Sequence, residues 1–182
     1  GDDPRQGYVE ENIFYHPNLR FQFPVPTKWE LSNKPSQVQL VSEREDAIIL
    51  FSVISGVTSR EAARDFVSKT NVRVIKSDAI QINGHSTQQV ISEIHTQKET
   101  YRLISCFIEK GRHVFVFHGL TLTSRFQNYG SLFENTMHQF RELSDPKRIH
   151  VKPDRIHVRY TRTTDALGNI LQSFGVPKEK LK

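Results

Sequence analysis

Eight histidines are the residues of this chain best suited to metal binding or acid–base chemistry. Their spacing matches no zinc motif: there is no H-E-x-x-H, no H-x-x-H and no pair four residues apart. His113 and His118 are five residues apart, which puts them on opposite faces of a strand. His150 and His157 lie on either side of Pro153. We predict no metal-binding histidine, unless folding brings distant residues together.

Cys106 is the only cysteine, so the chain forms no internal disulfide and contains no Cys-pair metal motif. It lies in the apolar run LISCFI, which favours a buried, unreactive thiol. The alternative is a nucleophile activated by a base, and His113 or His118 on a neighbouring strand is the candidate base.

Other catalytic motifs are absent from the sequence. There is no glycine-rich phosphate loop, no G-x-S-x-G and no outstanding pair of carboxylates. No apolar run approaches the roughly 20 residues that span a bilayer, which predicts a soluble mature chain without a transmembrane segment. We therefore predict a chain without catalytic residues and without a cofactor of its own.

The net charge of +5 belongs to the C-terminal part of the chain. Residues 1–140 contain 15 basic and 15 acidic side chains, whereas residues 141–182 contain 10 and 5. A neutral main domain argues against nucleic-acid binding. The basic side chains form either a solvated surface or a surface for an anionic partner such as a cell-wall polymer or lipid head groups. The candidates are Lys147, Arg148, Lys152, Arg155, Arg159 and Arg162.

The segment YHPNLRFQFPVPTKWEL, residues 15–31, predicts the first strand of the fold. Leu19, Phe21 and Phe23 alternate with polar residues, the period of a half-buried strand. The two prolines of FPVP end that strand and form a stiff corner. We expect this corner to place Trp29 against the core, with a second short strand at 29–31.

Further along the chain, the apolar pattern predicts strands at 37–42 and 47–54, then two hairpins, one around Asn83-Gly84 and one around residues 109–112. Thr58 and Glu61 form a capping box that begins a helix ending near Lys69. The run HVFVFHGLTL, residues 113–122, should be the most buried strand.

A second helix is predicted at 124–140, begun by an S-x-x-Q capping box at Ser124 and Gln127. Its wide apolar stripe predicts packing on a core, and Gly130 is a candidate for close approach to the sheet. The order of elements predicts an α+β fold, an antiparallel sheet with two packed helices.

The predicted domains are a linker or arm at 1–12, the α+β domain at 13–143, a linker at 144–154 and a small β-α unit at 155–182. In that unit a strand at 155–160 precedes an amphipathic helix at 165–174, ended by Gly175 and Pro177. One strand and one helix cannot bury a core, so this unit must dock elsewhere or be a fragment.

Two resemblances add to this reading. Residues 12–143 resemble PsbP-like domains, through FQFPVPTKW, the helix after TSREA, NGHSTQQV and the closing MHQFREL. The segments DPRQGYVEENIFYHPNLRFQFPVP and FRELSDPKRIHVKPDRIHVRYTR resemble the region after the catalytic domain of bacterial exported zinc metallopeptidases of the HtpX-related, β-barrel assembly-enhancing class. The zinc ligands of that family lie upstream, so the resemblance implies a noncatalytic accessory region that positions the protease on envelope substrates or partners.

The final segment, RIHVRYTRTTDALGNILQSFGVPKEKLK, resembles the first half of a LysM glycan-binding module. The matching positions are Val158, Asp165, Leu167, Ile170, Phe174, Gly175, Val176 and Leu181. Together the resemblances imply a periplasmic or envelope location and a protein or envelope partner, with glycan or another anionic surface met by the basic tail. The alternative is a stand-alone PsbP-like binding lipoprotein or scaffold without a protease.

Overall fold

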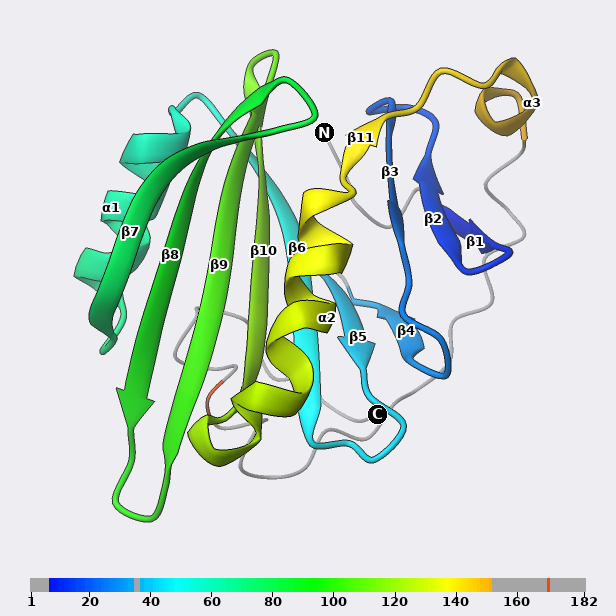
Figure 1. Cartoon of the computed structure of the whole chain (residues 1–182). Helices are drawn as coiled ribbons and strands as arrows, with labels where there is room; N and C mark the ends of the chain where they lie inside the picture. The colour runs from blue at the N-terminus through cyan, green and yellow to red at the C-terminus, as the bar shows by residue number, and fades with distance from the viewer. Residues whose placement is uncertain (1–6, 35–36, 152–169, 171–182) are drawn as a thin grey trace.

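A computed structural model describes residues 7–34, 37–151 and 170, and its main body is a large antiparallel sheet (Figure 1). Seven strands form this sheet, in the order β4-β5-β6-β10-β9-β8-β7. They are β4 (Glu30–Asn33), β5 (Val38–Val41), β6 (Ala47–Ser55), β7 (Arg73–Ile82), β8 (His85–His95), β9 (Thr100–Lys110) and β10 (His113–Leu122). The predicted hairpins are confirmed, and residues 113–122 form the central strand, buried over most of their length.

A second, smaller antiparallel sheet has the order β1-β2-β3-β11. Its strands are β1 (Tyr8–Glu10), β2 (Ile13–His16), β3 (Phe21–Pro24) and β11 (Arg141–Glu142). The strand containing Phe21 and Phe23 therefore lies outside the main sheet, which corrects the single-sheet prediction. Residues 8–10 are a strand where the sequence predicted a linker. The reason is that alternation reveals a strand but not its partner, and only folding brings β11 beside β3.

Helix α1 (Ser59–Lys69) covers one face of the large sheet at β8 and β9. The predicted capping box is confirmed, because the Thr58 hydroxyl accepts from the Glu61 backbone N–H and the Glu61 carboxylate accepts from the Thr58 backbone N–H. Ala62 and Ala63 are buried against the sheet.

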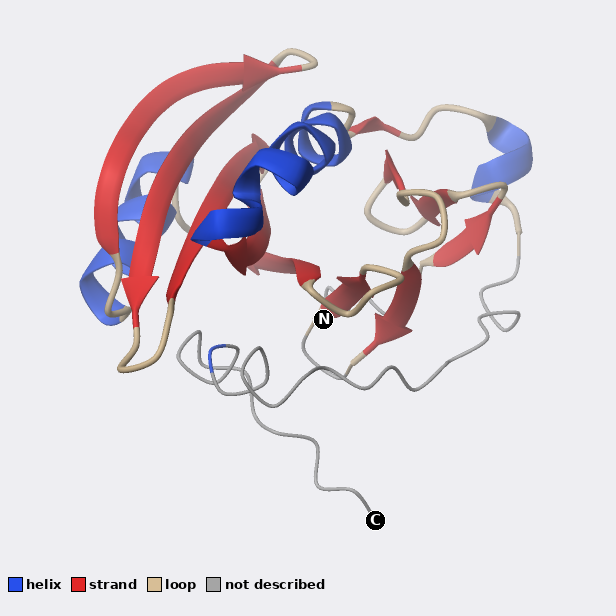
Figure 2. Ribbon diagram, turned by 60° about the horizontal axis from the view of Figure 1, so that its bottom comes forward, coloured by secondary structure: helices blue, strands red, loops and turns tan. Residues whose placement is uncertain are grey.

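Helix α2 (Phe126–His138) lies on the opposite face of the large sheet, beside the small sheet (Figure 2). The predicted S-x-x-Q cap is wrong. A 3₁₀ turn, Thr123–Arg125, precedes the helix, and the N-cap residue is Arg125, which makes no side-chain cap hydrogen bond. Ser124 lies inside this turn, so its hydroxyl is not at the helix start.

The close approach between α2 and the sheet depends on Gly119 of β10 and not on Gly130. A Cβ built on Gly119 would lie 2.6 Å from Cγ of Phe133, a buried residue of α2. A Cβ on Gly130 would instead meet the ring of Phe126, one turn earlier in the same helix, at 3.0 Å. The glycine on the strand therefore makes room for the helix.

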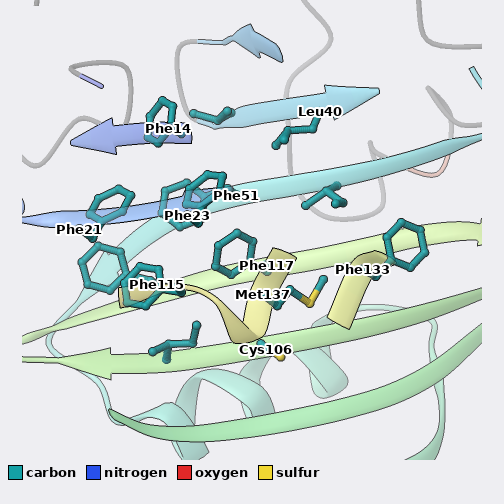
Figure 3. Close-up of a cluster of buried hydrophobic side chains, with 14 of the residues drawn as sticks. Phe14, Phe21, Phe23, Leu40, Phe51, Cys106, Phe115, Phe117, Phe133 and Met137 are labelled. Atoms are coloured by element: carbon teal, nitrogen blue, oxygen red, sulfur yellow. The ribbon is translucent and has the colours of Figure 1, made fainter. Parts of the chain in front are cut away.

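Aromatic rings fill the core between the two sheets and α2 (Figure 3). The small sheet contributes Phe14, Phe21 and Phe23, and the large sheet contributes Phe51, Phe115 and Phe117. Phe133 and Met137 come from α2, and Phe140 lies two residues after its end. Trp29 packs edge-on against Tyr129 and Phe133, at centroid distances of 6.1 and 6.3 Å. This confirms that the proline corner brings Trp29 to the core.

A short helix, α3 (Pro146–Ile149), lies within the predicted 144–154 linker and packs on the small sheet, so that part of the linker prediction is wrong. The proposed boundary at 155 lies outside the described residues. Ile170 is the one described residue beyond 151, and it is helical and buried. It belongs to a buried cluster with Ile48, Leu50 and Leu120, against which Phe66 of α1 also packs.

Because Ile170 belongs to this cluster, we expect Ile170→Ala to lower the free energy of unfolding of the main domain by about 2 kcal/mol. Urea unfolding followed by Trp29 fluorescence measures the change, since the tail contains no tryptophan. If the transition of Trp29 keeps its midpoint, the tail is an independent unit.

Candidate functional site

Cys106 is not part of a reactive pair. The thiol is fully buried in the aromatic core, and its Sγ lies 3.5 Å from Oε1 of Gln89. Burial raises the pKa of the thiol far above its usual value. Cys106 pairs with Phe117, so the adjacent His118 projects to the other face of the sheet. His113 is four residues from Phe117 along β10, about 13 Å away.

The structure reveals a serine–histidine pair that the sequence analysis did not identify. Ser105 and His118 are cross-strand partners, and Oγ and Nδ1 lie 2.7 Å apart. Both residues are buried, and the rings of Phe66 and Phe107 lie 4.5 and 5.8 Å from the imidazole. Burial lowers the pKa of His118 to about 3. A substrate cannot reach this hydroxyl, so the pair has a packing role.

The buried His118 makes stability depend on pH. In the unfolded chain a histidine binds a proton near pH 6.5, whereas the folded protein binds one only near pH 3. Between these values the unfolded state holds more protons, so the free energy of unfolding falls as pH decreases. We expect a loss of about 2 kcal/mol from this residue between pH 7.5 and 5.

Urea unfolding at pH 7.5 and pH 5 of the wild-type protein and of His118→Asn tests this expectation. The variant removes the titrating group, so its loss of stability over the same interval should be smaller by about 2 kcal/mol. Equal losses in the two proteins would contradict it.

Among residues 7–34, 37–151 and 170, no group of three His, Cys, Asp or Glu side chains is placed to hold a metal ion. The same part of the chain contains no helix long and apolar enough to cross a membrane. The catalytic candidates are buried, so a partner or ligand meets other polar groups, on the accessible surface.

Such a surface begins with a row of side chains that crosses all four strands of the small sheet. The cross-strand partners are Tyr8 with Tyr15, Tyr15 with Gln22, and Gln22 with Arg141. Directly paired residues of neighbouring antiparallel strands project to the same face. The row therefore runs from two tyrosines, through a buried glutamine, to an exposed arginine at the edge strand β11.

Helix α3 covers the tyrosine end of this row. The Tyr8 hydroxyl donates to the backbone carbonyl of Arg148 at 2.7 Å. The Arg148 guanidinium lies 4.9 Å from the centre of the Tyr15 ring, a cation–π geometry, and forms an ion pair with Glu10. Among the described residues, α3 leaves the other end of the row uncovered, where Arg141 is exposed.

At the uncovered end lies an open polar cleft of about 450 Å³, which we call the Arg141 cleft. The Gln22 amide oxygen accepts from Nη2 and Nε of Arg141 at 3.1 and 3.2 Å, in the amide orientation that satisfies both side chains. Asn83, at the β7–β8 turn, donates from Nδ2 to the carbonyls of Phe140 and His138, which fixes that turn against the chain leading into β11. The cleft is lined by Tyr15, Gln22, Asn83, Arg141, Glu142, Ser144, Asp145 and Arg148.

Of the six basic residues predicted to meet an anionic partner, Arg148 lines this cleft and Lys147 is exposed beside it on α3. Lys152, Arg155, Arg159 and Arg162 lie outside the described residues. The sequence analysis missed Arg141, because no local motif indicates that Gln22 will hold an arginine 119 positions later.

No protein-family model and no curated protein match this sequence. Several solved structures share its fold. Cyanobacterial PsbP (CyanoP) from Synechocystis sp. PCC 6803 is 12% identical with a TM-score of 0.58, and the match covers 71% of this chain and 91% of that one. LpqN, involved in cell envelope biogenesis of Mycobacterium tuberculosis, is 14% identical with a TM-score of 0.53, covering 68% and 83%. A protein from Bacteroides thetaiotaomicron is 11% identical with a TM-score of 0.55, covering 75% and 50%.

These similarities confirm the PsbP-like fold predicted from the sequence. At 11–14% identity they are evidence for the fold alone. The peptidase parent, the LysM-like tail and the periplasmic location stay predictions.

Proposed function

We propose that this PsbP-like chain is a noncatalytic binding domain that engages a protein partner through the Arg141 cleft. The observation that carries the proposal is the contrast between accessible and buried polar groups. The thiol and the serine–histidine pair are enclosed in the core, whereas two guanidinium groups line an open cleft. Clefts with a few fixed polar groups are the usual location of binding sites.

Site-directed photo-crosslinking tests this proposal in the full-length protein in its own cells. A benzophenone amino acid replaces Ser144, which lines the cleft, and the matched control replaces Ser68 on α1, an exposed serine on the opposite face of the large sheet. The proposal requires one defined product at position 144 that is missing at position 68. Identical products at both positions, or none, would refute it.

In the wider protein, we propose that the domain is the accessory region of an exported zinc metallopeptidase, where it positions the protease on envelope substrates or partners. The resemblance of the segments at both ends of the domain to such peptidases supports this. The envelope role of LpqN, which has this fold, agrees with an exported location.

The alternative is a stand-alone binding lipoprotein or scaffold. It is favoured by the coverage of the structural neighbours, because this fold makes up 91% of the CyanoP chain and 83% of the LpqN chain. The gene upstream of Asp2 distinguishes the two. An H-E-x-x-H helix in the same reading frame supports the peptidase, whereas a signal peptide directly before this segment excludes it.

A further inference from the structure

The two acidic residues that line the Arg141 cleft form no ion pair with Arg141 and have other interactions. Asp145 is the N-cap of α3, and its Oδ1 accepts from the backbone N–H of Lys147 at 3.0 Å. Glu142 pairs with Phe21, so it projects to the face of β11 opposite Arg141. There burial lowers the pKa of Lys110 and of His85, and the charge of Glu142 partly offsets this.

Arg141 is held in place, and within the described part of the chain it forms no ion pair. Its interaction within the described part of the chain is with the neutral Gln22 amide, which is buried and rigidly placed between Tyr15 and β11. Gln22 uses the Nε–Nη2 edge of the guanidinium. The Nη1–Nη2 edge stays available, and its two parallel N–H groups match the two oxygens of a carboxylate.

Resting on the proposed binding function, we propose that the Arg141 cleft binds a carboxylate of a protein partner against the Nη1–Nη2 edge of Arg141. Arg148 supplies a second positive charge, already shared with Glu10 and the Tyr15 ring. The carboxylate belongs to an acidic side chain within the partner or to its C-terminus.

The flat Nη1–Nη2 edge of Arg141 matches the planar shape of a carboxylate. Inorganic phosphate is the competing anion. Doubling the charge of the anion doubles both its attraction to Arg141 and Arg148 and its repulsion by Asp145 and Glu142, so the test includes phosphate as a probe.

NMR titration of the full chain with short capped peptides tests the proposal. The probes are Ac-Gly-Glu-Gly-NH₂ for a side-chain carboxylate, Ac-Gly-Gly-Gly-OH for a terminal one, Ac-Gly-Gln-Gly-NH₂ as the neutral match, and inorganic phosphate. The Arg141 Nε–Hε resonance and the Ser144 amide report on the cleft. We expect one or both carboxylate peptides to shift these resonances and the Gln peptide to leave them unchanged; which carboxylate peptide binds identifies the source.

Arg141→Gln should weaken the binding of the carboxylate peptide by about tenfold, because it removes a charged hydrogen-bonding partner. Arg60→Gln is the matched control. Arg60 is an exposed residue of α1, far from the cleft on the other side of the large sheet, so this variant should bind the peptide like wild type. An unchanged amide spectrum away from the cleft shows that each variant is folded.

Three outcomes would overturn the inference: equal shifts with the Glu and Gln peptides, unweakened binding by Arg141→Gln, or tighter binding of phosphate than of either carboxylate. These results are separable from a failure of the proposed function. If neither carboxylate peptide binds while crosslinking at Ser144 still captures a partner, the binding function stands and the carboxylate assignment is wrong. If Ser144 crosslinks nothing specific, the binding function itself falls.

Discussion

Phe21→Ala is expected to lower the free energy of unfolding by about 3–5 kcal/mol, among the largest effects of any single substitution in this domain. The ring is fully buried where the two sheets and the end of α2 meet. Its centroid lies 5.1 Å from that of Phe51, 4.9 Å from Phe115 and 5.5 Å from Phe140. Alanine removes these contacts and leaves a cavity that rigid neighbouring rings cannot fill.

Equilibrium urea unfolding followed by circular dichroism measures this loss. Val9→Ala, on the exposed side of β1, is the matched control and should change stability by less than about 0.5 kcal/mol. A loss below about 1 kcal/mol for Phe21→Ala would mean that the small sheet does not depend on this core.

Gly119→Val is expected to cost about 3 kcal/mol or more, for the opposite reason. Here the substitution adds atoms to a filled space, since even the first added carbon would lie 2.6 Å from Cγ of Phe133. That atom is at the base of a buried ring and cannot move without shifting α2. Thermal unfolding should show a lower midpoint with the same native secondary structure.

Two further variants distinguish a clash with Phe133 from a general sensitivity of β10 to substitution. Phe133→Leu removes the ring, so in the double variant the penalty of Gly119→Val should shrink by at least about 1 kcal/mol. Gly130→Ala, which meets only the partly exposed Phe126, should change stability by no more than about 1 kcal/mol. If the stability losses of Gly119→Val and Phe133→Leu simply add in the double variant, the clash with Phe133 is ruled out.

The residues of the cleft could be predicted from local sequence patterns only in part. Arg148 was a candidate because it belongs to a basic tail, and it does line the cleft. Arg141 had no such signal, since its role depends on pairing with Gln22 across β3 and β11. Ser105 and His118 were hidden in the same way, because a cross-strand register joins them. Register between distant strands is set by the whole core.

The local elements follow from the amino-acid sequence alone. Thr58 and Glu61 specify the start of α1, Asn83-Gly84 specifies the β7–β8 turn, and the central strand follows from its β-branched and aromatic residues. These features depend on backbone preferences and on apolar period, which act over a few residues.

Which elements lie together depends on tertiary packing. The strand of Phe21 joins a second sheet, Gly119 rather than Gly130 admits α2, and Ile170 joins a buried cluster of the large sheet. Each of these depends on packing between segments far apart in the chain, where shape and burial select one arrangement from several that local preferences allow equally. The Arg141 cleft is a product of that selection.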